Sequence, residues 1–216
     1  LRGVGPKLAA RLEAYGIERV EDLLFHFPLR YQDRTRVTPI GGLVAGSEAV
    51  VEGAVRGAEV AFGRRRSLLV LLQDGTGTLT LRFFHFSNAQ RQALRAGVRL
   101  RCFGQVRSGP RGAELVHPEY RTVGPGSAPV EDRLTPIYPT TEGIGQQQWR
   151  KLCGQAVALL KRQPPEDLLA GVDDDNFTLA DAIAYLHAPP ACAALDALQD
   201  GRHPAQLRLA REELLA

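Results

Sequence analysis

The sequence has few cysteines, and their pattern is not one that stabilises a small fold. Cys102, Cys153 and Cys192 are odd in number, lie far apart, and have no cysteine or histidine at metal-ligand spacing. A secreted disulfide framework and a zinc-binding domain are therefore disfavoured, and a reduced, cytoplasmic compartment is expected. With 216 residues, the chain is long enough to bury a core without such cross-links and to form one or two domains.

Long apolar runs and methionine are also missing. Runs such as Leu68 to Leu72 are far shorter than the roughly 20 residues that span a bilayer, and no charged-then-apolar leader precedes them. We therefore expect a soluble protein. Because the chain has no methionine and stops within the helix-like run from Gln206 to Leu215, we expect it to be a segment of a longer protein.

The short motifs of common enzymes are absent as well. The sequence contains no phosphate-binding Gly-x-x-x-x-Gly-Lys-Ser/Thr loop and no Gly-x-Ser-x-Gly nucleophile motif, and its five histidines are not paired at zinc spacing. Three consecutive carboxylates, Asp173 to Asp175, point in different directions and are expected in a solvated loop. We therefore expect no catalytic residue, bound metal or cofactor within these residues.

Charge is distributed unevenly along the chain. Residues 1–124 hold 19 Lys and Arg against 11 Asp and Glu, whereas residues 125–216 hold 8 against 13. A basic front half favours a polyanionic partner, and an acidic back half favours solvent or a basic surface. Only Lys7, Lys151 and Lys161 are lysines, so arginine supplies nearly all of the positive charge, which suits planar recognition of phosphates and bases.

Residues 1–48 are expected to form an N-terminal helical hairpin and a lead-in. Pro6 marks a helix start, apolar residues follow it at helical spacing, and Gly16 marks its end. A second helix is expected from Val20 to Phe27, because Pro28 disfavours helix for the residue before it.

The glycines before the first helix allow two interpretations. Gly3, Gly5 and Lys7 resemble the turn of a helix-hairpin-helix element, in which backbone N–H groups approach a phosphate and a lysine adds charge. A Gly-x-Gly sequence is also an ordinary way to turn between packed helices. The sequence leaves both open.

Residues 49–145 are expected to form a five-stranded OB-fold, which is a small Greek-key β-barrel. One helix, capped by Asn88 and closed at Gly97, falls between the third and fourth strands, and three strands, a helix and two strands is the order of this fold. A strap rich in Gly, Pro, Ser and Thr follows from residue 125 to 145. The expected strands lie near residues 49–60, 67–73, 78–86, 98–106 and 113–121.

Residues 146–216 are expected to be helical and to lead toward a part of the protein beyond this chain. The run from Gln146 to Arg162 places apolar residues on one side, and residues 179–186 and 204–215 continue the pattern. The apolar residues of the first run are Trp149, Leu152, Ala156, Leu159 and Leu160. The fold class is therefore α+β, with a central barrel flanked by helical segments.

The strand from Thr78 to Phe86 carries the first functional signal. Alternation starting from Leu79 sends Phe83 inward but sends Arg82 and Phe84 outward. A nucleic-acid base is the partner that uses both outward groups, because it offers a π-face to the ring and a phosphate to the guanidinium. Burial of Phe84 against the strap is the alternative.

Two arginine-bearing loops flank this strand in the expected fold. An OB-fold binds ligands with strands 2 and 3 and with the loops that join strands 1 to 2 and 4 to 5. The first loop holds Arg64, Arg65 and Arg66, and the second holds Arg107 and Arg111. A basic groove with an aromatic platform is typical of binding to single strands without sequence preference. A solvated hairpin tip is the alternative for Arg64 to Arg66.

Several segments together resemble the RecG family of ATP-dependent branched-DNA helicases. The resemblance runs from end to end and corresponds to that family's N-terminal region, a wedge domain built on an OB barrel. Its motor domains are not in this chain. The segments are Asp22 to Arg34, Phe62 to Arg66, Asp74 to Phe84, Gly112 to Tyr120, Leu134 to Gly143 and His203 to Gln206.

The resemblance implies a role in DNA repair and recombination. The parent enzyme would reverse stalled replication forks and migrate Holliday junctions, with ATP and Mg²⁺ in its motor domains. Phe83 and Phe84 would stack on the parting bases while the basic loops hold strands. Alternation places Phe83 in the core, and a bulge near Arg82 would reconcile the two. The resemblance also implies a monomer, an association with single-stranded DNA-binding protein, and a cytoplasmic location at the bacterial nucleoid.

Two other functions remain open from the residues alone. One is a stand-alone OB module that binds single-stranded nucleic acid, and the other is a protein-interaction barrel that uses the Arg82 and Phe84 face.

Overall fold

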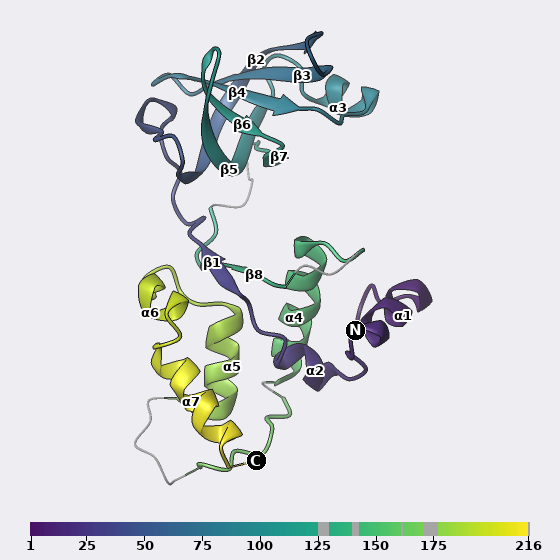
Figure 1. The fold of residues 1–216 in the computed structure, drawn as a ribbon, viewed down its shortest axis with the longest axis vertical. Helices are drawn as coiled ribbons and strands as arrows, with labels where there is room; N and C mark the ends of the chain where they lie inside the picture. Colours follow the sequence, from purple (N-terminus) through teal and green to yellow (C-terminus); the bar gives the residue numbers. More distant parts are fainter. Residues whose placement is uncertain (125–129, 140–142, 161, 171–176, 216) are drawn as a thin grey trace. The chain divides into compact units, whose positions relative to one another are not determined.

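The computed structural model describes residues 1–124, 130–139, 143–160, 162–170 and 177–215. The chain divides into two compact units (Figure 1): a helical unit of residues 1–33 and 132–216, and a β unit of residues 34–131. The predicted α+β class is confirmed, because one unit holds most of the helices and the other holds a mixed sheet. The division at residues 48 and 145 stays a prediction, and the observed contacts group the N-terminal helices with the C-terminal ones.

The helical unit packs helices from both ends of the chain around apolar side chains. Its helices are α1 (Pro6–Ala14), α2 (Val20–Leu24), α4 (Gln146–Leu160), α5 (Leu179–His187), α6 (Leu195–Gln199) and α7 (Pro204–Glu213). A short antiparallel pair joins β1 (Arg30–Gln32) to β8 (Thr135–Ile137). The segments α6, β1 and β8 are too short to carry a periodic signal and were not predicted.

The predicted start and end of α1 are confirmed, whereas α2 is shorter than predicted. Proline stands at the first position of α1, and Gly16, with φ of 73°, follows its last turn. The α2 helix ends at Leu24, earlier than the predicted Phe27. A carboxylate fixes its start, since Asp22 accepts hydrogen bonds from the backbone N–H of Glu18 and Arg19.

Trp149 lies at the centre of the helical core with no exposed surface. His26 stacks on its ring at 4.3 Å between centroids. The predicted apolar face of α4 is confirmed at Leu152, Ala156 and Leu160, which are buried. Leu159 is 42% exposed and does not belong to that face, because it lies one residue, or about 100°, from Leu160 around the helix.

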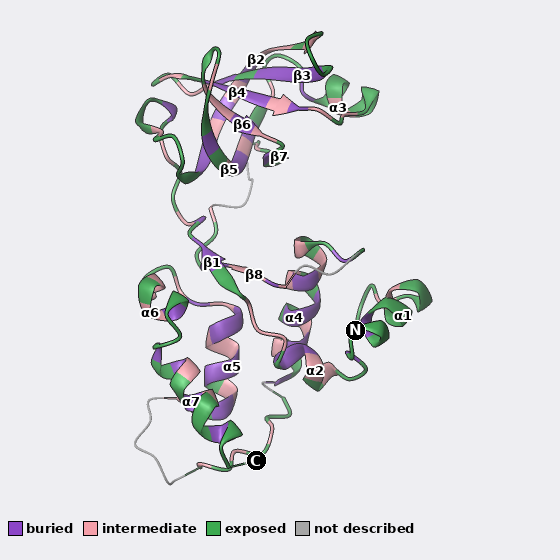
Figure 2. Cartoon of the chain, viewed as in Figure 1, coloured by how far each residue is buried: buried purple, intermediate pink, exposed green. Residues whose placement is uncertain are grey.

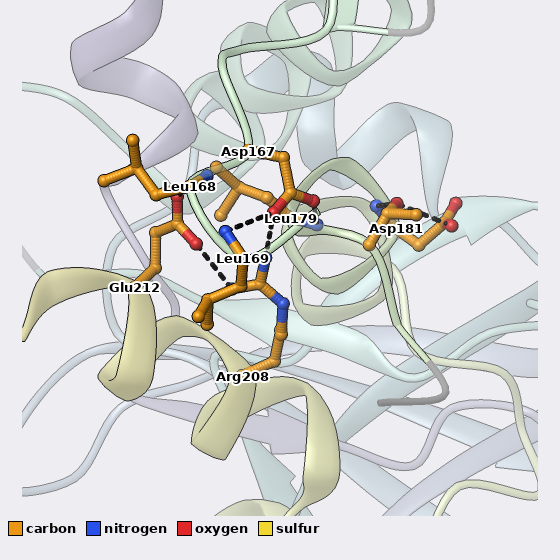
Figure 3. Close-up of polar contacts among 8 residues, drawn as sticks. Asp167, Leu168, Leu169, Leu179, Asp181, Arg208 and Glu212 are labelled. Atoms are coloured by element: carbon orange, nitrogen blue, oxygen red, sulfur yellow. Dashed lines mark hydrogen bonds and ion pairs between the residues drawn. The ribbon is translucent and has the colours of Figure 1, made fainter. Parts of the chain in front are cut away.

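Arg208 forms a buried charge network in the helical unit (Figure 3). Its guanidinium pairs with Glu212 at 2.6 Å and with Asp167. The two carboxylates also accept backbone hydrogen bonds, Glu212 from Leu168 at 2.7 Å and Asp167 from Leu179 at 2.9 Å. The network therefore ties the segment before α5 to both α5 and α7.

We predict that Arg208→Ala lowers the free energy of unfolding by about 3–5 kcal/mol, because two carboxylates lose the cation that offsets their burial. Urea unfolding of the 216-residue chain measures the change. Arg202→Ala is the matched control, since Arg202 forms an exposed ion pair with Asp200 and should change stability by less than about 0.5 kcal/mol. Equal effects of the two variants would contradict a stabilising role for the network.

The β unit contains a mixed sheet in which the hydrogen-bonded pairs close a circuit. The order is β2-β3-β4-β6-β5-β7, and β2 also pairs with β5. The β4–β6 pair is parallel and the others are antiparallel. The elements are η1 (Ile40–Gly42), β2 (Glu48–Ala61), β3 (Ser67–Gln73), β4 (Thr78–Phe83), α3 (Asn88–Ala93), β5 (Arg99–Gly109), β6 (Gly112–Val116) and β7 (Glu119–Thr122).

Several predicted boundaries in the β unit are wrong. The predicted strand 113–121 is interrupted at His117, whose φ of 48° is incompatible with a strand, and Pro118 follows it. Ser87 rather than Asn88 caps α3, because the Ser87 hydroxyl accepts from the Gln90 N–H at 3.0 Å. The β5 strand continues to Gly109, so Arg107 lies on a strand and not in a loop.

The β4 strand is largely buried (Figure 2), and its predicted inward residues lie in the core. Thr80, which alternation places outward, is buried as well. Leu79 and Leu81 have no exposed surface, and Phe83 is 3% exposed. The β3–β4 register continues without a shift to the pair Leu68 and Phe83. The bulge predicted near Arg82 is therefore wrong, and the register shift lies in β2 instead.

Asp74 organises the turn between β3 and β4. Its carboxylate accepts hydrogen bonds from the Thr76 N–H and hydroxyl, the Gly77 N–H and the Ile40 N–H of η1. Gly41 packs against this turn, where a Cβ would lie 2.7 Å from the Thr76 carbonyl oxygen. Burial works to raise the pKa of Asp74, but these hydrogen bonds outweigh it and lower the pKa to about 2.

We predict that Asp74→Ala lowers the free energy of unfolding at pH 7 by about 1.5–3 kcal/mol, because four donors lose a charged acceptor. The folded-state pKa lies below the unfolded value, so this contribution is complete above about pH 4 and is lost as the pH falls toward about 2. Urea unfolding at pH 7 and about pH 3 should show the difference from wild type shrinking.

Glu59→Ala is the control, because the Glu59 ion pair with Arg111 is exposed and should contribute little at either pH. A loss in Asp74→Ala that is equally large at both pH values would show that the carboxylate charge is not responsible.

Candidate nucleic-acid interface

An open hollow of about 610 Å³ lies between the tip of the β2–β3 hairpin and the end of β4. It brings together the outward residues of the predicted strand and part of the first basic loop. The lining residues are Ala61, Phe62, Gly63, Arg64, Arg65, Ser67, Arg82 and Phe84. Four of the predicted site residues, Arg64, Arg65, Arg82 and Phe84, therefore share one surface.

His117 holds Phe84 at the rim of this hollow. The Phe84 N–H donates to His117 Nε2 at 3.1 Å, and the two rings lie 5.8 Å apart. The His117 N–H in turn donates to the Arg82 carbonyl oxygen at 2.8 Å. His117 therefore packs locally against half-buried Phe84 and holds its backbone N–H.

Phe83 belongs to the core of the β unit. Its ring contacts Tyr120 at 5.6 Å and His117 at 6.0 Å, both edge-on. Stacking of Phe83 on DNA stays a prediction, and from this structure it requires the ring to leave the core. Of the two aromatics predicted to stack on DNA, Phe84 is the one that lines the hollow.

Arg82 is held by a carboxylate on the neighbouring strand. Its Nε and one terminal nitrogen donate to Glu114 Oε2 at 3.1 and 2.9 Å, and its other terminal nitrogen lies 3.4 Å from the Ser67 hydroxyl. Gly109 makes room for this carboxylate, since a Cβ there would lie 2.6 Å from Glu114 Oε2. Arg82 therefore lines the hollow as part of a neutralised pair, and its contact with DNA stays a prediction.

The other predicted arginines differ in whether their side chains contact another group. Within the described part of the chain, Arg64, Arg65 and Arg107 are exposed and form no ion pair or hydrogen bond. Arg66 lies over the Phe86 ring at 4.9 Å. Arg111, at the β5–β6 turn, pairs with Glu59 of β2 at 2.5 Å.

The N-terminal glycines lie in the helical unit, in a different compact unit from the hollow. Gly3 has φ of 85° and lies against Lys151 of α4, and the backbone of Arg2 exchanges hydrogen bonds with the Gln155 side chain. Packing against α4 is therefore observed, while phosphate contact by Gly3, Gly5 and exposed Lys7 stays a prediction.

Among the described residues, no group of three or more His, Cys, Asp or Glu side chains is placed to hold a metal ion. The carboxylates Asp173 to Asp175 lie outside those residues. In the same part of the chain, no helix has the length and apolar character needed to cross a membrane.

Comparison with known proteins identifies the family. The RecG wedge domain matches residues 1–160. The chain belongs to this family. The ATP-dependent DNA helicases RecG of Escherichia coli (strain K12) and Pasteurella multocida (strain Pm70) are 46% identical over 218 residues and 47% identical over 219 residues. Both alignments cover 100% of this chain and 32% of the relative, so the chain spans about a third of the length of these relatives.

A solved structure supports the same assignment to the RecG wedge family. The structure of RecG bound to a three-way DNA junction matches 99% of this chain and 29% of its own, with a TM-score of 0.71 and 28% identity. The family resemblance predicted from the sequence motifs is therefore confirmed.

One aromatic of the hollow in this RecG wedge-family chain, Phe62, was not predicted from the sequence as a site residue. Phe62 follows the last residue of β2 and is 82% exposed in the hollow. The sequence signal for it is an aromatic placed between a strand end and a glycine at a basic hairpin tip.

We predict that His117→Ala lowers the free energy of unfolding by about 1–2 kcal/mol, because it removes an acceptor and leaves alanine at positive φ. His117→Gly removes the same acceptor but adopts this φ without strain, so it should cost less. Urea unfolding ranks the two variants. If His117→Gly lowers the free energy of unfolding more than His117→Ala does, the positive φ at this position does not strain alanine.

Proposed function

We propose that this chain binds branched DNA and separates its strands at the branch point, as the wedge of a longer ATP-dependent DNA helicase. The observation that carries the proposal is the hollow at the end of β4, where half-buried Phe84 stands beside unpaired Arg64 and Arg65. Membership of the RecG wedge family and the likeness to RecG bound to a three-way DNA junction support it.

Phe84 would act by supplying a replacement stacking surface. Separating a base step costs a few kcal/mol, and an aromatic side chain returns about 1–3 kcal/mol for each base that stacks on it. Because the Phe84 ring is half-buried and lies 5.8 Å from the His117 ring, it has less side-chain freedom to lose when a base stacks on it.

The exposed arginines would hold the phosphates on either side of this ring. Arg64 and Arg65 at the hairpin tip and Arg107 on β5 carry charges that no described carboxylate neutralises. Phosphate contacts are independent of base identity and weaken with salt. The proposed complex is therefore selected by DNA shape and not by sequence.

We further propose that the β unit is an OB-fold barrel. The closed circuit of strand pairs from β2 through β3, β4, β6 and β5 supports this assignment, as does the position of α3 between β4 and β5. The hollow then lies at the loop between strands 1 and 2 and at the strand 2 and 3 face, where such folds bind ligands.

The chain has no ATP-binding motif, so the proposed enzyme would bind ATP and Mg²⁺ in motor domains beyond these residues. ATP hydrolysis there would pull duplex DNA against the wedge, in fork reversal and Holliday junction migration. A monomeric state, a cytoplasmic location and an association with single-stranded DNA-binding protein also belong to the proposal.

The first experiment measures the affinity of the 216-residue chain for a fork, a Holliday junction, duplex DNA and single-stranded DNA over a salt series. We predict tighter binding to the branched substrates, and a salt slope that falls by about one when Arg64 or Arg65 is replaced by alanine. Arg202→Ala in the helical unit is the control and should leave the slope unchanged.

Equal affinity for all four substrates would overturn the wedge function. Equal binding of forks and single strands, both tighter than duplex, would favour a stand-alone single-strand module. Weak binding to every DNA would favour a protein-interaction surface.

The second experiment places Phe84→Ala in the full-length helicase that contains this chain. We predict that fork unwinding falls by at least about fivefold, the equivalent of one lost stacked base, while duplex-stimulated ATP hydrolysis changes little. Phe25→Ala, which removes another exposed ring, is the matched control. If unwinding and ATP hydrolysis fall together, Phe84 supports the fold and not strand separation.

A further inference from the structure

Phe62 has no role in the function proposed above. Among the exposed aromatic side chains of the described residues, it has the largest exposed fraction. It is 82% exposed, whereas Phe25 is 54% and Tyr15 is 43% exposed. A ring that projects from a hairpin tip into solvent gains nothing for the fold. A ligand that covers it would remove this apolar surface from water.

We propose that Phe62 and Phe84 together form a binding site for one unpaired nucleotide, with the base in the hollow between the hairpin tip and the end of β4. The inference rests on the proposed function and names a second stacking residue and an occupant for the same site. It assigns to Phe62 the capture of a strand that Phe84 has parted.

The shape and lining of the hollow fit a nucleobase. Its volume of about 610 Å³ lies within the range of small-molecule sites, which is about 300–1,000 Å³. Phe62 and Phe84 enter it from different strands, one at the end of β2 and the other just after β4. Two rings from separate elements can contact a planar group from two directions, and a base presents two π-faces.

The charges around the hollow fit a single phosphate group next to that base. Arg82 is neutralised by Glu114, and Arg66 lies over the Phe86 ring. Arg64 and Arg65 line the hollow, are exposed, and have no ion pair or hydrogen bond among the described residues. These two guanidinium groups are therefore available to a phosphate without breaking an existing contact.

An unpaired nucleotide fits this site better than duplex DNA. In a duplex, each base face is covered by its neighbours, so two rings cannot reach one base without unstacking it. An acidic peptide with an aromatic residue is the other ligand with a planar group and a negative charge. The test therefore includes DNA substrates that differ only in the presence of one base.

The test uses forks in which a tetrahydrofuran abasic residue replaces one nucleotide at a time around the branch point. The proteins are the 216-residue wild-type chain and its Phe62→Ala, Phe84→Ala and Phe25→Ala variants. For the wild type, removal of one particular unpaired base should weaken fork binding by at least about fivefold. Phe62→Ala should lose a similar factor on the intact fork and should no longer respond to that abasic position.

Phe25→Ala should bind and respond as the wild type does, because Phe25 lies in the helical unit. Thermal unfolding checks that Phe62→Ala folds normally, as expected for a ring that is 82% exposed. Phe84→Ala should likewise lose the abasic response, because the proposed site needs both rings.

The outcomes separate this inference from the function on which it rests. If the wild type prefers forks but Phe62→Ala binds them equally well and shows the same abasic response, the nucleotide site is overturned and the wedge function stands. If the wild type does not prefer forks, the wedge function itself fails. Binding of an acidic aromatic peptide that Phe62→Ala abolishes, with no abasic response in the wild type, would assign the hollow to a protein ligand.

Discussion

The parallel pairing of β4 with β6 sets the geometry of the candidate interface. It aligns Thr80 with Glu114 and Arg82 with Val116, so that the residues just beyond each strand also meet. Glu114 then reaches the Arg82 guanidinium, and His117 reaches the backbone of Phe84. Without this register, Arg82 would lack its carboxylate and Phe84 would end a strand with no fixed direction. The core contacts of Phe83 depend on the same register, because His117 follows β6 directly and Tyr120 lies on β7, the next strand.

The arginines predicted to bind DNA are of two kinds. Arg82 and Arg111 are tied to carboxylates of neighbouring strands, and Arg66 rests on an aromatic ring. The partly buried Arg82–Glu114 pair joins β4 to β6 beside the hollow, whereas the exposed Arg111–Glu59 pair contributes little to stability. Arg64 and Arg65 retain their charge at the edge of the same hollow. The hollow is therefore lined by one arginine held by a carboxylate and by two unpaired arginines. Such a site has a fixed geometry and a positive charge that attracts a polyanion.

The helical unit is stabilised by different interactions. Residues from both ends of the chain share an apolar core around Trp149. A buried ion network around Arg208 joins the segment near Asp167 to α5 and α7. A charge network of this kind is costly if any member is removed, so it specifies one arrangement of helices. The shared apolar core around Trp149 holds residues 1–33 and 132–216 together, although nearly 100 residues of the β unit separate them in the chain.

The sequence alone determined the features that depend on local periodicity. Alternation from Leu79 correctly assigned the inward residues of β4, and the arginine runs and family motifs pointed to nucleic acid. Side-chain alternation is a property of a strand by itself, so it survives without knowledge of any partner. The tertiary structure decided which charges are neutralised, that Phe83 lies in the core without a bulge, and that His117 pins Phe84. These outcomes depend on the register between segments more than 30 residues apart, such as Phe84 and His117, which no local pattern encodes.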